Sequence, residues 1–203
     1  RHSATPAVTL LPMTRLASVL VVVLLLTACS ETDSSAPSTD DPAPPPTSAV
    51  AFDRDNPVEV PEHGVTIDQP HGWAAELDVE DSLLQVSAPA PTDGFTPNFN
   101  VAVGDIPDDL PALAYFEGEI PRLEATLPDV EILEVANLTI DGAQARGITL
   151  TSTENDTTIG ISRLIILDES NRAWEVTFFA EASTLERLSR VVQTIFSSFE
   201  FLD

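Results

Sequence analysis

Positive charge is scarce in this sequence, which contains no lysine and only nine arginines among its 203 residues. These arginines face 33 aspartates and glutamates, which gives a formal net charge of −24 at pH 7. A field of this sign repels nucleic acid and anionic lipid headgroups, and it favours cationic partners. The charge therefore excludes nucleic-acid binding. Because the chain has one cysteine, it also has no internal disulfide, and its folded part depends on packing.

Catalytic signatures are also missing. The chain has no Gly-x-Ser-x-Gly sequence and no glycine-rich phosphate loop. His63 and His71 are the only histidines after residue 56, whereas a zinc site needs three or four convergent ligands. Asp105, Asp108 and Asp109 cluster before a predicted helix, and Asp108 and Asp109 are expected to place negative charge and a cap at its N-terminus. The sequence thus predicts no catalytic residue, no metal site and no cofactor.

The single cysteine, Cys29, follows an eleven-residue apolar stretch, Leu16 to Leu26. Met13-Thr14-Arg15 precedes that stretch with one positive charge, as in a secretory signal. The stretch is too short to span a bilayer, which takes about 20 apolar residues. Leu26-Thr27-Ala28-Cys29 resembles the lipobox of bacterial lipoproteins, which implies diacylglyceryl modification of Cys29. An ordinary secretory signal with a chance cysteine is the alternative.

Three segments follow from this interpretation. Residues 1–28 comprise upstream residues and a signal peptide that is removed, and residues 29–56 form a lipidated cysteine and a Pro/Ser/Thr-rich tether with Pro44-Pro45-Pro46 in a row. The tether has too little apolar surface to offset the entropy of ordering it. Residues 57–203 form one globular domain, which contains 27 of the acids and six of the arginines. We expect the mature protein on the outer face of the plasma membrane.

Apolar and polar residues alternate through much of this domain, which is typical of half-buried strands. The alternating positions are Val65 and Ile67; Phe99, Val101 and Val103; Ile148 and Leu150; Ile159, Ile161, Ile165 and Leu167; and Trp174, Val176 and Phe178. Turn sequences such as Asp141-Gly142 separate neighbouring strands, so we expect antiparallel pairing. Phe178 and Phe179 are adjacent and should point to opposite faces, one of them beneath a helix or in a groove.

Helical spacing appears twice. From about Leu110 to Leu127 apolar residues share one side, and Pro121 is expected to kink or divide this helix. The residues on that side are Leu113, Phe116, Ile120, Leu123 and Leu127. The second helix carries an apolar face from Leu185 to Phe196, and Ser183-Thr184-Leu185-Glu186 predicts a capping box at its start. The element order predicts an α+β fold with an antiparallel sheet flanked by helices.

Several short elements of the domain resemble a known family. They are the Gly72-Trp73 pair after a proline turn, the run from Pro97 to Val101, Tyr115 on the first helix, the Asp141-Gly142 turn, and the closing Ser198-Phe199. This succession, from about Gly64 to Phe201, resembles the actinobacterial LpqN/LpqT type of lipoprotein and, more distantly, the PsbP-like fold. The resemblance implies a layered α+β fold and a binding or accessory role.

Three functional hypotheses remain. The first is a non-enzymatic, lipid-anchored binding or adaptor module of the bacterial cell envelope, whose partner is an envelope protein with a basic surface. The second is a carrier of a hydrophobic ligand such as an envelope lipid, which requires an apolar cavity open to solvent. The third and weakest is a hydrolase that uses paired carboxylates. The sequence names no ligand-binding residue.

Overall fold

A computed structural model describes residues 51–52, 57–91, 94–107 and 109–202. Cys29 and the predicted signal peptide lie outside the described residues. The elements are β1 (Val58–Val60), η1 (Pro61–His63), β2 (Val65–Ile67), β3 (Ala74–Val79), β4 (Ser82–Ser87), β5 (Asn98–Asp105), α1 (Ala112–Thr126), β6 (Val130–Ile140), β7 (Ala143–Glu154), β8 (Thr157–Leu167), β9 (Arg172–Glu181), α2 (Ala182–Ser197) and β10 (Glu200–Phe201). No helix within these ranges is long and apolar enough to span a bilayer.

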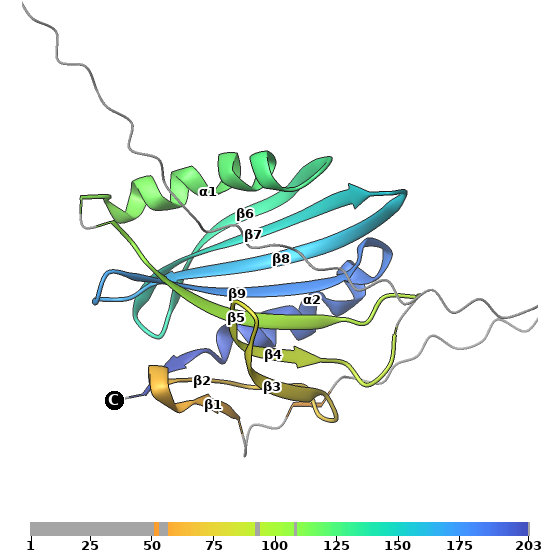
Figure 1. The fold of residues 1–203 in the computed structure, drawn as a ribbon, viewed down its shortest axis with the longest axis horizontal. Coiled ribbons are helices and arrows are strands. Elements are labelled where there is room, and N and C mark those ends of the chain that lie inside the picture. Colours follow the sequence, from red (N-terminus) through yellow and green to blue (C-terminus); the bar gives the residue numbers. More distant parts are fainter. Residues whose placement is uncertain (1–50, 53–56, 92–93, 108, 203) are drawn as a thin grey trace, which may run out of the picture. The chain divides into compact units, whose positions relative to one another are not determined.

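The strands form two antiparallel sheets. The larger has seven strands in the order β3-β4-β5-β9-β8-β7-β6, and the smaller has three in the order β1-β2-β10. Strands β6 to β9 follow one another in the chain as a meander (Figure 1). Asp141 and Gly142, which join β6 to β7, both have positive φ values, 47° and 79°, as a tight hairpin turn of the mirror-image type requires. The predicted α+β fold and antiparallel pairing are confirmed.

Each face of the large sheet has its own hydrophobic core. Phe99, Trp174 and Phe178 are fully buried in a cluster with residues of α2 and of the small sheet. The opposite face packs against α1 in a second cluster, to which the half-buried Phe179 contributes. Phe178 and Phe179 therefore point to opposite faces, as the alternation predicts. The domain has three layers: α1, the large sheet, and α2 together with the small sheet (Figure 1).

Helix α1 corrects three expectations. It runs without interruption through Pro121, so the proline does not divide it. Proline removes one bond, to the carbonyl of Glu117, and both residues are exposed, so water can satisfy that carbonyl. Leu113 is 61% exposed rather than part of the core face. The N-cap is Pro111, without a side-chain cap, so Asp109 does not cap the helix; Asp108 lies outside the described residues.

Helix α2 has the predicted apolar face, with Leu185, Val191 and Ile195 buried, but not the predicted capping box. Strand β9 passes directly into α2, so the N-cap position is Glu181 and Ser183 already lies in the first turn. The hydroxyl of Thr184 instead donates to the Glu181 carbonyl at 2.9 Å. The continuous chain between strand and helix leaves no room for a Ser183 cap.

Candidate functional site

Helix α1 covers only part of its face of the large sheet. The cluster beneath it draws its strand residues from β6 to β9, whereas none of its members comes from β3, β4 or β5. On those three strands the same face carries polar and small side chains, among them Glu76, Gln85 and Asn100, and α1 borders it along one side. We call this uncovered area the polar sheet face.

A row of polar side chains crosses this face. The strand registers pair Glu76 of β3 with Gln85, Gln85 with Asn100, Asn100 with Thr177, and Thr177 with Arg163 of β8. Residues paired across antiparallel strands share a face, so the five side chains form one line from the sheet edge to a position beneath α1. Exposure falls along the line from Glu76, which is exposed, to Thr177, which is buried.

Two amide side chains stand out in this area. Asn100 is half-buried and makes no side-chain hydrogen bond with any described residue, so its amide is free to bind a ligand group. Gln85 makes one long bond, from Nε2 to the Ser87 hydroxyl at 3.4 Å. Amide groups of this kind supply both donors and acceptors. The face is therefore suited to recognising a polar surface.

The row ends at an ionic cluster of four residues, two on α1 and two on the strands beneath it. Glu119, whose side chain is 4% exposed, accepts two hydrogen bonds from Arg122, from Nε at 3.0 Å and from Nη2 at 2.5 Å. Arg163 forms an ion pair with Glu175 of β9 and lies 3.9 Å from Glu119, measured between Nε and Oε2. Arg122 also approaches Glu175 at 3.8 Å. Two carboxylates and two guanidinium groups thus neutralise one another.

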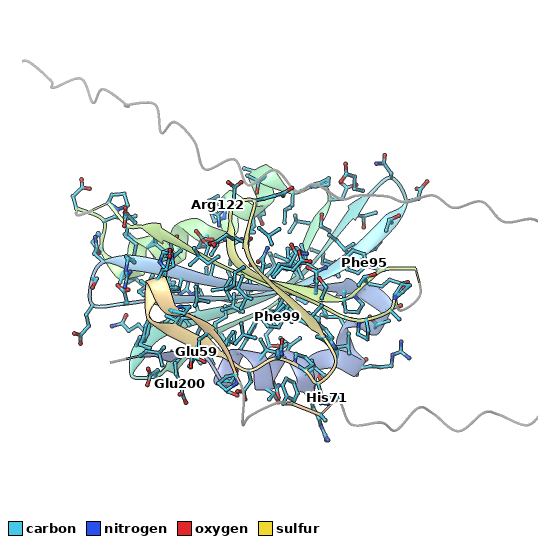
Figure 2. The ribbon with its side chains drawn as sticks, turned by 60° about the horizontal axis from the view of Figure 1, so that its bottom comes forward. Glu59, His71, Phe95, Phe99, Arg122 and Glu200 are labelled. Carbon is cyan, nitrogen blue, oxygen red and sulfur yellow. The ribbon has the colours of Figure 1, made fainter. Side chains whose placement is uncertain are left out.

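Burial, hydrogen bonds and the charges of this cluster shift the pKa values of Arg122 and of the neighbouring Tyr115. The hydrogen bonds that Arg122 donates to Glu119 raise the pKa of Arg122, although burial opposes them, so the guanidinium stays charged. Burial raises the pKa of the neighbouring Tyr115 phenol, and the negative charges of Glu175 and Glu119 raise it further. The phenol stays protonated and remains a hydrogen-bond donor at the border of the polar sheet face. Arg122 lies on the α1 side of the sheet, away from His71 (Figure 2).

The carboxylates of the cluster do not form the pair that a glycosidase uses. In such enzymes one carboxylic acid donates a proton and a second carboxylate attacks or activates water. Glu119 and Glu175 are instead both held by arginines, and Glu119 is almost completely buried. The geometry supports positioning and recognition, and it gives the hydrolase hypothesis no support.

A hollow of about 800 Å³ lies open to solvent at one end of the sheets. Charged and polar residues, including His63, Asp141 and Arg172, border it. Asp168 at its wall accepts four hydrogen bonds, from the backbone of Ser170 and Arg172, from Arg172 Nε and from Trp174 Nε1. This carboxylate therefore has a structural role. The hollow is not the apolar cavity that a lipid carrier requires.

The residues considered from sequence do not converge on one site. His63 lies in η1, 6.1 Å from the Trp174 ring between ring centroids, while His71 is exposed in a turn. Within the described ranges no three His, Cys, Asp or Glu residues are grouped so as to hold a metal ion. Asp105 and Asp109 are exposed. Cys29 lies outside the described residues.

The exterior is strongly acidic. Among the described residues, 19 aspartates and glutamates are exposed but only two arginines, Arg187 and Arg190. The other four arginines contact carboxylates, carbonyls or aromatic rings within the domain. Glu59 and Glu200 illustrate the pattern, since they lie on either side of Thr66 in the small sheet (Figure 2). Folding thus buries positive charge and displays negative charge.

Comparison with known proteins defines the fold and no more. No family model and no curated protein matches the chain. It is similar to the solved structure of LpqN, described as involved in cell envelope biogenesis of Mycobacterium tuberculosis, at 16% identity and a TM-score of 0.57, covering 77% of this chain and 93% of that one. For PsbP of Synechocystis the identity is 11%, the TM-score 0.54 and the coverage 78% and 97%. For the Ran-binding protein Mog1p of Saccharomyces cerevisiae the identity is 12% and the TM-score 0.54, and the match covers 76% of this chain and 97% of that one. The chain has a PsbP/Mog1-like fold.

Sequence reasoning missed the residues of this site, although signals for them existed. Asn100 lies between the apolar residues Phe99 and Val101, so the alternation places it on the opposite face of the strand. Glu119 interrupts the apolar side of the first helix, and Arg163 interrupts an otherwise apolar strand. A charged residue on a buried face is rarely tolerated without a partner, so each interruption indicates a paired group.

Proposed function

We propose that this chain is a non-enzymatic binding module of the bacterial cell envelope, anchored to the outer face of the plasma membrane by a lipid on Cys29. The polar sheet face recognises an envelope protein that presents a basic surface. The observation that carries the proposal is this open face, on which Asn100 and Gln85 are accessible beside a rigid ionic cluster. The two arginines of this cluster, Arg122 and Arg163, are neutralised by its carboxylates. The net charge offered to a partner is therefore that of the acidic exterior.

The membrane anchor rests on the sequence around Cys29. Its lipobox-like residues follow a short apolar stretch, and a polar, proline-containing segment follows them. The likeness in fold to a mycobacterial protein of cell envelope biogenesis is consistent with this location. Several acyl chains, at about 0.8 kcal/mol per buried CH₂ group, give stable attachment.

The charge distribution favours a cationic protein over an anionic ligand. With 19 exposed acids against two exposed arginines, the described surface attracts basic groups and accelerates their encounter. Asn100 and Gln85 contribute hydrogen bonds that fix orientation. The carrier hypothesis receives no comparable support, because charged residues such as Asp141, Asp168 and Arg172 border the hollow of about 800 Å³.

The anchor is tested by intact-mass spectrometry and detergent partitioning of the full chain expressed in a lipoprotein-processing bacterium, beside Cys29→Ala. We expect a diacylglyceryl mass increment and partitioning into detergent for the wild type, and loss of both in the variant. Identical unmodified masses for the two chains would refute the anchor and leave the binding face to be judged on its own.

The binding face is tested by photo-crosslinking in intact envelopes. A benzophenone side chain placed at Asn100 is compared with one at Gln193, which is exposed on α2. We expect adducts with a basic protein from position 100 only, and their loss when Gln85→Lys is added. Equal adducts from both positions, or adducts insensitive to Gln85→Lys, would contradict recognition by this face.

A further inference from the structure

Strand β6 forms one edge of the large sheet. It is the last strand in the sheet order and pairs only with β7, so along its outer side alternate backbone N–H and C=O groups have no strand partner in the described chain. At 11 residues it is a long edge. Figure 1 shows β6 beside α1 at the border of the sheet. An unpaired edge of this length is a template for another strand.

The C-terminal half of β6, which follows an irregularity in the pairing with β7 between Ile132 and Glu134, lacks the features that usually protect an edge. From Val135 to Ile140 it contains no charged residue, no proline and no glycine, and the register with β7 is regular. Val135 and Leu138 are 42% and 41% exposed. They belong to opposite faces, since Val135 pairs with Ile148 of the α1-side cluster and Leu138 with Ala145 of the other.

The other edge of the sheet differs. Strand β3 has six residues, and Asp78 and Glu80 have positive φ values, 55° and 51°, which interrupt its extended backbone. Glu76 and Asp81 add further charge to the same hairpin. Charges and irregular backbone of this kind block edge pairing. Of the two edges, the Val135–Ile140 part of β6 is therefore the better suited to accept a strand.

An open hollow of about 280 Å³ adjoins β6. Leu113 and Phe116 of α1 line it together with Asn137, Leu138 and Arg146. The Arg146 guanidinium is engaged, donating to the Phe116 carbonyl at 2.9 Å and to Asn137 at 3.2 Å, and lying 5.1 Å from the Phe116 ring centroid. The hollow thus offers apolar surface to a side chain of a strand lying along β6.

Acidic residues stand at both ends of the apolar segment. Asp129, Glu131 and Glu134 precede it and Asp141 follows it, and all four are exposed. A second copy of this chain would bring the same charges, and a net charge of −24, against itself. A strand with apolar residues in its centre and basic residues at its ends is complementary to the apolar segment and to the acidic residues that flank it.

We propose that the β6 edge binds an extended segment of another protein, with an apolar centre and basic ends, as an added strand of the large sheet. The inference rests on the proposed function for the charge of the partner, but it concerns a surface separate from the polar sheet face. The two surfaces would let one domain hold a folded partner and an extended segment together, as an adaptor does.

The probe is the peptide acetyl-Arg-Lys-Val-Thr-Val-Thr-Val-Lys-Arg-amide, labelled with fluorescein and titrated by anisotropy with the full chain in detergent. We expect binding that slows hydrogen exchange of the amides of Val135–Ile140. Leu138→Lys should weaken it at least about tenfold. The matched control is Leu77→Lys, which adds the same charge to β3 at a side chain that is 50% exposed and should change affinity less than about twofold.

Two further peptides separate strand addition from charge attraction alone. A version N-methylated at its valines keeps the charge but loses backbone donors, and we expect it not to bind. Equal binding of that version, or equal weakening by Leu77→Lys and Leu138→Lys, overturns the strand-edge inference while leaving a cationic partner in place. A version with glutamate for arginine and lysine that binds equally well contradicts the proposed charge preference. Self-association abolished by Leu138→Lys would assign the edge to a second copy and overturn the inference.

Discussion

Asp168→Asn should destabilise the domain strongly at neutral pH, although the change removes little volume. The side chain is 8% exposed, and its two oxygens accept different bonds. Oδ1 accepts from the backbone of Ser170 at 2.8 Å and of Arg172 at 3.0 Å, which an amide oxygen can also do. Oδ2 accepts from Arg172 Nε at 2.8 Å and Trp174 Nε1 at 2.9 Å, and in asparagine an NH₂ donor replaces this oxygen.

The magnitude follows from these two lost bonds. Trp174 is fully buried, and an indole N–H left without an acceptor costs about 1–3 kcal/mol. Arg172 is one-third exposed, so the loss of its ion pair costs only about 0.5–1 kcal/mol. We therefore expect a loss of about 1.5–4 kcal/mol in the free energy of unfolding at pH 7. A domain of this size retains its fold after such a loss.

The loss should also depend on pH. Burial raises the pKa of Asp168, but hydrogen bonds from Trp174 and Arg172 outweigh it and hold the pKa below the usual value. The stability that this carboxylate contributes is thus present above about pH 4 and is lost as the pH falls through its lower folded-state pKa. The difference between wild type and Asp168→Asn should shrink below about pH 4.

Urea denaturation followed by circular dichroism at several pH values measures this effect, with Glu169→Gln as a control at the adjacent exposed carboxylate. The control should change the free energy of unfolding by less than about 0.5 kcal/mol. The reasoning is refuted if Asp168→Asn costs no more than the control at pH 7, or if its cost does not decrease in acid.

Two further predictions concern packing and the ionic cluster. In Gly160→Ala the added Cβ would lie 2.8 Å from Leu185 Cδ2 and 3.1 Å from its Cβ, so α2 must shift and the free energy of unfolding should fall by about 1–3 kcal/mol. Gly147→Ala, whose Cβ meets only the end of a leucine side chain at 3.3 Å, should cost less in the same urea denaturation assay. Equal costs would contradict the packing described. Tyr115 is the only tyrosine, so absorbance at 295 nm reports it alone, and its phenol should remain protonated beyond pH 10, where an unfolded control in urea ionises. Because the pKa of Tyr115 is raised in the folded chain, the free energy of unfolding should fall as the pH rises above about 10. Glu175→Gln removes a negative charge and should lower the pKa of Tyr115. Ionisation of Tyr115 at its usual pH in the folded chain would contradict its buried position.

Much of the fold could be predicted because side-chain alternation and helical spacing are local properties. The strands around Phe99, Ile148 and Trp174 and both long helices lie where the periodicity places them. The failures are also local: Pro121 is accommodated on an exposed helix side, and Ser183 cannot cap a helix that continues directly from a strand. In each case the surrounding structure, which spacing does not contain, decided the outcome.

The candidate site could not be predicted in the same way. Asn100 and Thr177 are neighbours because β5 pairs with β9, although 76 positions separate the two residues in the chain. Glu119 meets Arg163, and Arg122 meets Glu175, only because α1 packs on that face. The interruptions of the apolar pattern indicate that partners exist, but which charge pairs with which depends on strand order.

The sequence alone determined the acidic character of the protein, the absence of a disulfide, the α+β class and the predicted modification of Cys29, since these follow from composition and from patterns of a few residues. Tertiary structure alone decided which polar residues share the uncovered face, which arginines are neutralised, and which edge of the sheet is unprotected. The physical reason is that a residue's direction along a strand or helix is set by its neighbours in the chain, whereas its partners are set by non-local pairing.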